Sequence, residues 1–408
     1  MTSSNVRTGH DGRARSGCEP AGTRALFVSV LALLLATGWV ANHFVGLMPV
    51  ISDSEHLSTA TLDGIFGIYA LGLLPGLLVG GRASDALGRR PVALTGSVAA
   101  LAGTAVMLLS QHTGALLLGR LIVGIGVGLA ISSCTAWASD LRGPVGAATA
   151  GVVLTAGFAL GPFVGGFIVW SGRSGIRVSF GVAAAIVVLA TFAVVGAARH
   201  TEVTESATDY DSGQAAPAAP AAPGFSRALS WAVPLAPWVY ASATLGFVTI
   251  PTRLHTALAA PMAAGTATLI VNGVSGVVQV LARALRWGPQ AGTAGAVLAA
   301  LGYAIAAIAP PTLTPALGLP LLVVLGCASG LCLREGLIDV EAAAPPHLRG
   351  ALTGVFYVIT YVGFALPLVL TTVGSAASVV ILSVMAVLAS AAAVTRAVRL
   401  RRDSHRQD

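Results

Sequence analysis

Charge is scarce in this sequence. Only 10% of its 408 residues are Asp, Glu, Lys or Arg, whereas a soluble domain carries about 25%. Hydrophobic residues make up 55% of the chain, and the mean hydropathy is +0.83. So few charges cannot cover a surface that faces water. The composition therefore excludes a soluble enzyme, a soluble nucleic-acid-binding protein and an intrinsically disordered chain.

Lysine is absent and cysteine is rare. All 23 basic residues are Arg, which fits the codon usage of a GC-rich genome and has no functional weight. The cysteines lack the spacing and the neighbouring histidines of a metal site, so we expect reduced thiols and no metal. No phosphate-binding loop is present either, so we expect no cofactor and no ATP-driven step. The four cysteines are Cys18, Cys134, Cys327 and Cys332.

Long apolar runs fill most of the chain. A helix needs about 20 apolar residues to cross a bilayer core of about 30 Å. The runs are continuous, unlike the short alternating segments of a membrane β-barrel. The sequence thus predicts an all-α integral membrane protein with twelve transmembrane helices. The expected spans are 25–50, 61–81, 91–110, 114–137, 147–170, 178–198, 231–252, 262–285, 290–309, 315–337, 350–372 and 376–397.

The arginines are distributed unevenly between the predicted loops. With the N-terminus inside, 19 of the 23 arginines fall in inside segments, three in outer loops, and Arg120 inside a span. Such a bias marks cytoplasmic loops. We therefore predict a multi-pass protein of the inner or plasma membrane with both termini in the cytoplasm. The basic charge reports topology and does not imply a nucleic-acid partner.

Residues 199–230 interrupt the apolar pattern with four acidic residues and an Ala-Pro run. This composition is typical of an exposed linker. Because six spans precede it and six follow, we predict two six-helix bundles with a site between them. The basic turns at 84–91 and 282–289, both ending in Pro, support a duplicated arrangement. The predicted segments are a cytoplasmic tail (1–24), an N-terminal bundle (25–198), the linker (199–230), a C-terminal bundle (231–398) and a second cytoplasmic tail (399–408).

The turn after the second span carries the most specific pattern. Gly81 and Gly88 permit a tight reversal, and Arg89 and Arg90 place positive charge at the cytoplasmic boundary. Asp85 can cap a helix or pair with an arginine. The alternative interpretation is an ordinary basic loop with an incidental acid.

Spans four and five contain further patterns. Arg120 within span four is costly unless it faces a cavity or a partner, or reaches the outer surface. In span five, glycines recur every four residues and form a smooth stripe that favours close helix packing. Pro162 predicts a local kink there. The residues of this pattern are Gly157, Gly161, Pro162, Gly165 and Gly166.

These patterns resemble the signatures of the major facilitator superfamily of secondary transporters. The loop matches at Gly81, Asp85, Gly88, Arg89 and Arg90, while Ala86 stands where the family usually has a basic residue. Arg120 followed by Gly124 and Gly128 is similar to the fourth-span motif, often tied to proton transfer. The fifth-span pattern resembles that of the drug–proton antiporter branch. The resemblance covers the whole chain and implies the major facilitator fold, a loop that locks the halves when the transporter faces outward, and export.

Two polar residues of span one are candidates for proton coupling. They are Asn42 and His43. His43 lies at about the depth of Arg120, and these two residues could share a polar patch in the central cavity, in which His43 exchanges a proton. The alternative is a histidine that is simply packed and hydrogen-bonded. Many proton-coupled exporters of the family carry an acidic residue within span one, and this sequence has none.

Two carboxylates are further candidates. Asp63 either caps span two together with Thr61 or is a proton site paired with Arg120. Glu335 follows Arg334 and precedes Asp339. These three residues form either a structural charge cluster or a proton exit near the cytoplasmic face.

The substrate cavity is predicted to be mostly apolar. Its candidate polar lining residues also have the simpler interpretation of groups that hold transmembrane helices together. They are Asn272 and Gln279, which share one face of span eight, and Tyr240, Tyr357 and Tyr361.

The sequence predicts proton-driven efflux of a small amphipathic organic compound by alternating access. The expected partners are this substrate, protons and the lipid bilayer, and a monomer suffices. A proton symporter that imports a metabolite is the alternative, although it needs more polar side chains in the cavity. An integral membrane enzyme needs a nucleophile, a metal cluster or paired carboxylates. Only Glu335, Asp339 and Glu341 approach that requirement, so no catalytic residue is predicted.

Overall fold

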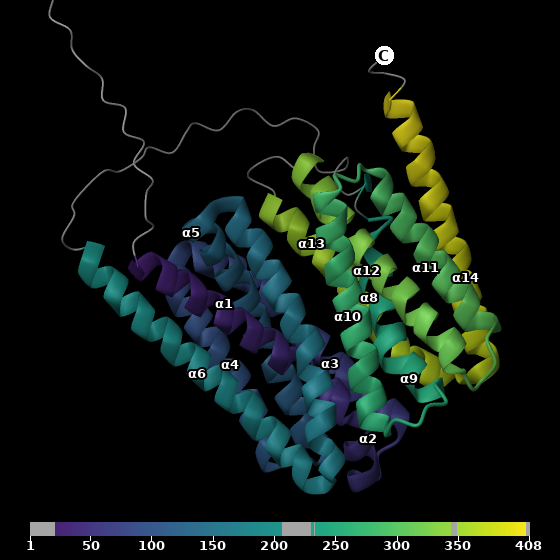
Figure 1. The fold of residues 1–408 in the computed structure, drawn as a ribbon, viewed down its shortest axis with the longest axis horizontal. Helices are drawn as coiled ribbons and strands as arrows, with labels where there is room; N and C mark the ends of the chain where they lie inside the picture. Colours follow the sequence, from purple (N-terminus) through teal and green to yellow (C-terminus); the bar gives the residue numbers. More distant parts are fainter. Residues whose placement is uncertain (1–20, 206–229, 232, 344–348, 405–408) are drawn as a thin grey trace, which may run out of the picture.

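The computed structural model describes residues 21–205, 230–231, 233–343 and 349–404, which form a bundle of long helices (Figure 1). Within these residues the only β-type pairing is an isolated bridge between Leu254 and Leu313. Most of the predicted N-terminal tail and the centre of the predicted linker lie outside the described residues.

The first half of the chain forms six long helical passes. The first pass consists of two helices that meet at His43. The fourth and fifth passes are joined in one helix, which leaves helical dihedral angles only at Arg142 and Gly143. The elements are α1 (Ala21–Asn42), α2 (Phe44–Glu55), α3 (Thr59–Leu87), α4 (Arg89–Leu109), α5 (Thr113–Ile168), η1 (Val169–Ser171) and α6 (Arg173–Glu205).

The second half is less regular. A π-helical turn, η2, divides the predicted seventh span, and a 3-10 turn, η4, follows α13. The elements are α8 (Ala236–Thr244), η2 (Leu245–Thr249), α9 (Ile250–Arg253), α10 (Ala260–Ala284), α11 (Gln290–Ile308), α12 (Pro315–Ala343), α13 (Arg349–Tyr361), η4 (Val362–Ala365) and α14 (Leu366–Ser404).

The described helices agree with the predicted membrane passes. Ten helical stretches are long and apolar enough to cross a bilayer. One of them, Leu352–Arg402, has 51 residues, enough for two passes, and it bends at Gly374. The segment 236–253 is helical but is interrupted by η2. An all-α multi-pass membrane protein is therefore confirmed, and the elements are consistent with twelve passes.

Helices α1 to α6 gather on one side of the molecule and α8 to α14 on the other (Figure 1). We call these groups the N half and the C half. Small residues allow close helix approach: a Cβ on Gly128 would lie 2.6 Å from the Leu73 carbonyl oxygen. The predicted bundle limits remain predictions, and α6 continues helically to Glu205, beyond the predicted end at residue 198.

The bundle has two distinct ends. The α2 end carries the α2–α3 turn and α9, and it is the end predicted to lie outside. The Gly88 end carries the α3–α4 turn and the start of α13, and it is predicted to be cytoplasmic.

Large apolar side chains cover much of the outer surface, with Leu109 and Ile308 at least 80% exposed. Such a surface suits contact with lipid.

Candidate functional site

Arg120 lies at the centre of the N half. Its side chain is fully buried, and Nη1 donates a hydrogen bond of 2.9 Å to the Ala41 carbonyl oxygen. The guanidinium carbon stands 4.4 Å from the Tyr69 ring centre and 4.9 Å from that of Phe44, a geometry in which aromatic faces attract a cation. Within the described residues, Nε and Nη2 have no hydrogen-bond partner. Arg120 therefore faces the interior and does not reach the outer surface.

His43 occupies the junction between α1 and α2. Its Nδ1 lies 3.1 Å from the Val40 carbonyl oxygen, and its ring meets Phe180 of α6 edge-on at 5.3 Å. No hydrogen bond or ion pair joins His43 to Arg120 among the described residues. Arg120 reaches this junction from α5 through Ala41, whereas His43 contacts Val40 and Phe180, so the predicted shared patch is not formed by direct contact.

Asn42 connects span one to span five. Its Nδ2 donates to the Phe158 carbonyl oxygen at 3.1 Å. Asn272 of α10 reaches the same oxygen at 3.4 Å from the C half. Asn272 therefore contributes to the boundary between the halves, while Gln279 bonds to Ser275 in its own helix at 3.1 Å.

Asp63 neither caps its helix nor pairs with Arg120. The cap of α3 is Ser58, whose hydroxyl accepts the Thr61 N–H at 3.1 Å. The Asp63 side chain is instead buried, and its Oδ2 accepts a hydrogen bond of 3.0 Å from Thr371 of α14. The contact spans 308 residues of sequence, which explains why the pattern around Asp63 did not predict it.

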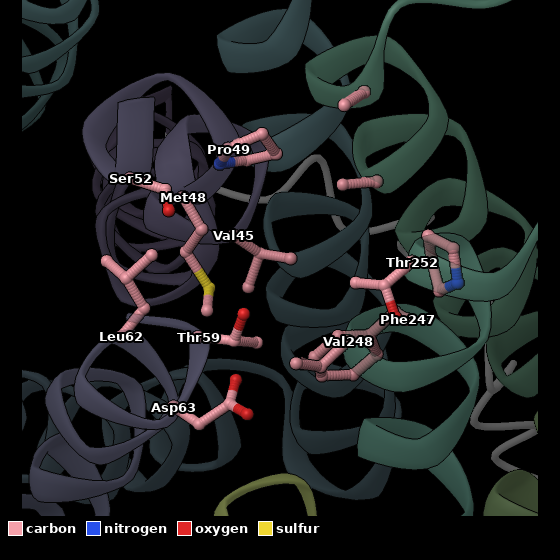
Figure 2. Close-up of a pocket in the computed structure, with 13 residues that line it drawn as sticks. Val45, Met48, Pro49, Ser52, Thr59, Leu62, Asp63, Phe247, Val248 and Thr252 are labelled. Atoms are coloured by element: carbon pink, nitrogen blue, oxygen red, sulfur yellow. The ribbon is translucent and has the colours of Figure 1, made fainter. Parts of the chain in front are cut away.

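A cavity of about 300 Å³ lies beside Asp63 at the α2 end. One wall comes from α2 and α3, and the other from η2, α9 and α10. Figure 2 shows the Asp63 carboxylate directed into the space between these walls. The cavity therefore lies across the boundary between the two halves. Its lining includes Val45, Met48, Leu62, Phe247, Val248 and Pro251.

The three predicted tyrosines come together next to this boundary. The Tyr240 and Tyr361 ring centres are 4.4 Å apart, and those of Tyr357 and Tyr361 are 6.4 Å apart. Phe364, which was not predicted, joins this group and stacks on Phe66 of the N half at 5.1 Å. An aromatic residue within an apolar span gives no sequence signal for such a role.

The side chains of the turn motif at the Gly88 end bond to other residues of the N half. Gly81 is helical, because α3 continues to Leu87, so the reversal needs Gly88 alone, with φ of +93°. Arg89 pairs with Asp85 and donates from Nε to Asp140 of α5 at 2.7 Å. Arg90 follows at the start of α4. The predicted loop is thus a one-residue turn, and its recorded bonds join α3, α4 and α5.

Glu335 belongs to a charge cluster at the same end of the C half. It is buried and pairs with Arg334, as expected from the sequence. Its neighbour Asp339 pairs with Arg396 of α14 at 2.5 Å, and Arg396 Nη2 lies 4.0 Å from Glu335. Arg396 is one of the 19 arginines predicted to lie inside, and no local sequence pattern indicates its role here.

The fifth-span stripe packs α5 between two helices. Gly157 and Gly161 face α1, and a Cβ on Gly161 would lie 2.8 Å from the Trp39 carbonyl oxygen. Gly165 faces His43 and Leu47. At the outer part of the stripe, Gly166 meets Pro261, and a Cβ on Gly265 would lie 2.6 Å from the Pro162 carbonyl oxygen. The stripe therefore holds α5 against α1 of its own half and α10 of the other half.

Three features point to one protein family. They are the twelve predicted passes in two halves, the intramembrane arginine and the turn motif. A sequence profile of the Major Facilitator Superfamily matches residues 28–368. The chain belongs to the Major Facilitator Superfamily. It is accordingly a multi-pass membrane protein of a transporter family and not an enzyme.

Part of the chain is similar to curated relatives. Two relatives are named multidrug resistance protein MdtL: that of Klebsiella pneumoniae is 34% identical over 106 residues, and that of Citrobacter koseri is 39% identical over 108 residues. Each alignment covers 26% of this chain and 27% of the relative. The chain thus matches about a quarter of the length of these relatives.

Solved structures share the whole fold. A peptide transporter POT in complex with sulfate has a TM-score of 0.73 over 94% of this chain and 95% of that chain. Its sequence identity is 14%, so the likeness establishes the major facilitator fold alone.

Proposed function

We propose that this transporter exports a small amphipathic organic compound in exchange for protons. The observation that carries the proposal is the fifth-span stripe, Gly157 to Gly166, which has the spacing of the drug–proton antiporter branch. In the structure this stripe packs against both α1 and α10. The local resemblance to two proteins named for multidrug resistance supports the same function.

The arrangement of contacts supports alternating access. Bonds between the halves gather from the middle of the molecule to the α2 end, and they include Asp63 to Thr371 and Asn272 to Phe158. The recorded bonds of Arg89 at the Gly88 end stay within the N half. A structure closed at the α2 end is the form that admits substrate from the Gly88 end.

The orientation follows from the arginine distribution. We place the Gly88 end and both termini in the cytoplasm of a cell with this protein in its inner or plasma membrane. The two bundles, 25–198 and 231–398, would then rock about the central site and expose it alternately. Arg120 would act from the N half on the moving proton, together with Asp63 or His43.

Inside-out vesicles from a host without its own pumps test the proposal. After energisation, a quenched dye reports the acidity of the lumen while compounds of a drug panel are added. An antiporter releases luminal protons when the compound is added outside, whereas a symporter releases them when the compound is loaded inside. We expect the first result with the wild type and none with Arg120→Ala.

Arg177→Ala provides the matched control, because Arg177 is an exposed arginine of α6. This variant should release protons as the wild type does. Proton release only from loaded vesicles would replace export by import. Absence of release with every compound in both arrangements would overturn proton-coupled transport of such compounds.

A further inference from the structure

The lining of the cavity at the α2 end contains one acidic side chain and no basic one. Its walls are mainly aliphatic and aromatic, with hydroxyl groups from Ser52, Thr59 and Thr252. Asp63 is the only ionisable side chain in the lining. A single carboxylate therefore sets the charge of a largely apolar space.

No cation neutralises this carboxylate within the described residues. The partner of Asp63 is the Thr371 hydroxyl, which is neutral. The neighbouring Arg253, at the end of α9, donates instead to the Ala309 and Pro310 carbonyl oxygens at 3.0 and 2.9 Å. Burying an ionised carboxylate without a counter-charge is costly. The site thus favours a species that brings positive charge.

We propose that this cavity binds a small organic monocation, an amine or a quaternary ammonium ion, with Asp63 as its counter-ion. The proposal deepens the efflux function proposed above and rests on it for its biological meaning. The apolar body of the ligand would displace water from Val45, Met48 and Val248. The Phe247 ring offers a face on which an alkylammonium group is attracted.

The size and position of the cavity fit such a ligand. About 300 Å³ is at the lower limit of small-molecule pockets, so compact cations enter and large ones do not. Because the two walls belong to different halves, movement of the halves takes the site apart. Thr371 positions the Asp63 carboxylate from the C half. The bound cation would therefore be released when the α2 end opens.

Calorimetric binding of benzyltrimethylammonium to the full chain in lipid nanodiscs tests the proposal. Asp63→Asn keeps the shape of the side chain and removes its charge. We expect it to weaken binding at least about tenfold, because the cation loses its counter-charge in a site that excludes water. Asp63→Glu should restore most of the affinity. Thr371→Val, which keeps the carboxylate, should bind within about threefold of the wild type.

Asp53→Asn is the control for general surface charge. Asp53 lies on α2 near the same end, is exposed and does not line the cavity, so its replacement should leave the affinity unchanged. The neutral carbon isostere, neopentylbenzene, should not displace the cation. Thermal unfolding of each variant shows whether it is folded.

Three results would overturn the cation site: no binding by the wild type, equal binding by a folded Asp63→Asn variant, or displacement by the neutral isostere. Because binding is measured without a gradient, none of them affects the efflux proposal. Conversely, Asp63-dependent binding in a protein that releases no protons with any compound overturns efflux and leaves the cation site standing.

Discussion

At the Gly88 end, the two halves pair an aspartate with an arginine in different ways. Each places an aspartate just beyond a corresponding predicted span: Asp140 of α5 follows span four, and Asp339 of α12 follows span ten. Asp140 is reached by Arg89 from the adjoining α4, and both side chains are partly exposed. Asp339 is reached by Arg396 from α14, and Arg396 is only 2% exposed. The Arg89 cluster is therefore accessible to water, whereas the Arg396 cluster is largely buried.

This difference indicates different mechanical roles. An exposed ion pair contributes about 0–1 kcal/mol, so the Arg89 cluster can open and close at little cost. A buried pair that loses one partner costs about 3–5 kcal/mol, because a charge is left without compensation. Arg396 of α14 also donates to the Pro289 carbonyl oxygen, just before α11, at 3.2 Å, so we expect this cluster to keep α11, α12 and α14 together when the halves move.

The turns explain why the halves diverge. In the N half, one residue separates α3 from α4, so Arg89 stands directly beside Asp85 and Asp140. In the C half, five residues, 285–289, separate α10 from α11. Neither Arg283, in the last turn of α10, nor Arg286, in the connecting turn, forms an ion pair with the carboxylates of the Arg396 cluster among the described residues. The charge that Asp339 needs comes from α14 instead.

Removing the buried arginine should have the largest effect on this comparison. Arg396→Met leaves Asp339 and Glu335 with too little positive charge in a buried site. We expect a loss of about 3–5 kcal/mol in the free energy of unfolding, measured by denaturant titration of the purified protein. Arg399→Met is the matched control. Arg396 and Arg399 both lie over the Trp231 ring, but Arg399 donates to the Ser230 carbonyl oxygen and pairs with no carboxylate among the described residues. Equal losses in both variants would contradict a special role for the buried pair.

Neutralising the carboxylate should have the next largest effect. Asp339→Asn retains a hydrogen-bonding group towards Arg396 but removes its charge, and Glu335 remains 4.0 Å from the arginine. We expect a loss of about 1.5–3 kcal/mol, the usual contribution of a hydrogen bond to a charged group. Glu341→Gln, an exposed position on the same helix, should change stability by less than about 0.5 kcal/mol. A loss at Asp339 no greater than at Glu341 would show that the cluster is not effectively buried.

The sequence predicted what depends on local composition. Long apolar runs predicted the helices. The arginine inside span four predicted a charge that faces a cavity or a partner or reaches the outer surface, and the structure places Arg120 in the interior. The turn at Gly88 was recognised from its motif. These features are local, since each is encoded within one span or one turn.

Contacts between distant segments could not be predicted. Asp63 meets Thr371 and Arg396 meets Asp339 only after helices from different parts of the chain pack together. The irregular η2 segment, which supplies Phe247 to the cavity, looks in the sequence like any other apolar stretch. Hydropathy reports burial in the membrane but does not report which helix faces which.

A double-mutant cycle should find only weak coupling in the N half. Arg89→Gln, Asp140→Asn and their combination isolate the pair energy. We expect about 0.2–1 kcal/mol, because water screens both side chains. The corresponding cycle of Arg396 and Asp339 should exceed it at least about twofold. Equal coupling energies in the two cycles would show that the exposed Arg89 cluster and the buried Arg396 cluster do not differ in strength.

Salt should produce the smallest effect and act on one cluster only. Raising the ionic strength from about 0.1 to 1 M shortens the screening length from about 10 to 3 Å. The Arg89–Asp140 coupling should then fall by about half, since these side chains are 26% and 53% exposed. The Arg396–Asp339 coupling should stay unchanged, because Arg396 is buried and dissolved ions cannot reach the pair. If both couplings fell together, water would reach the C-half cluster, and its rigidity would have to come from helix packing alone.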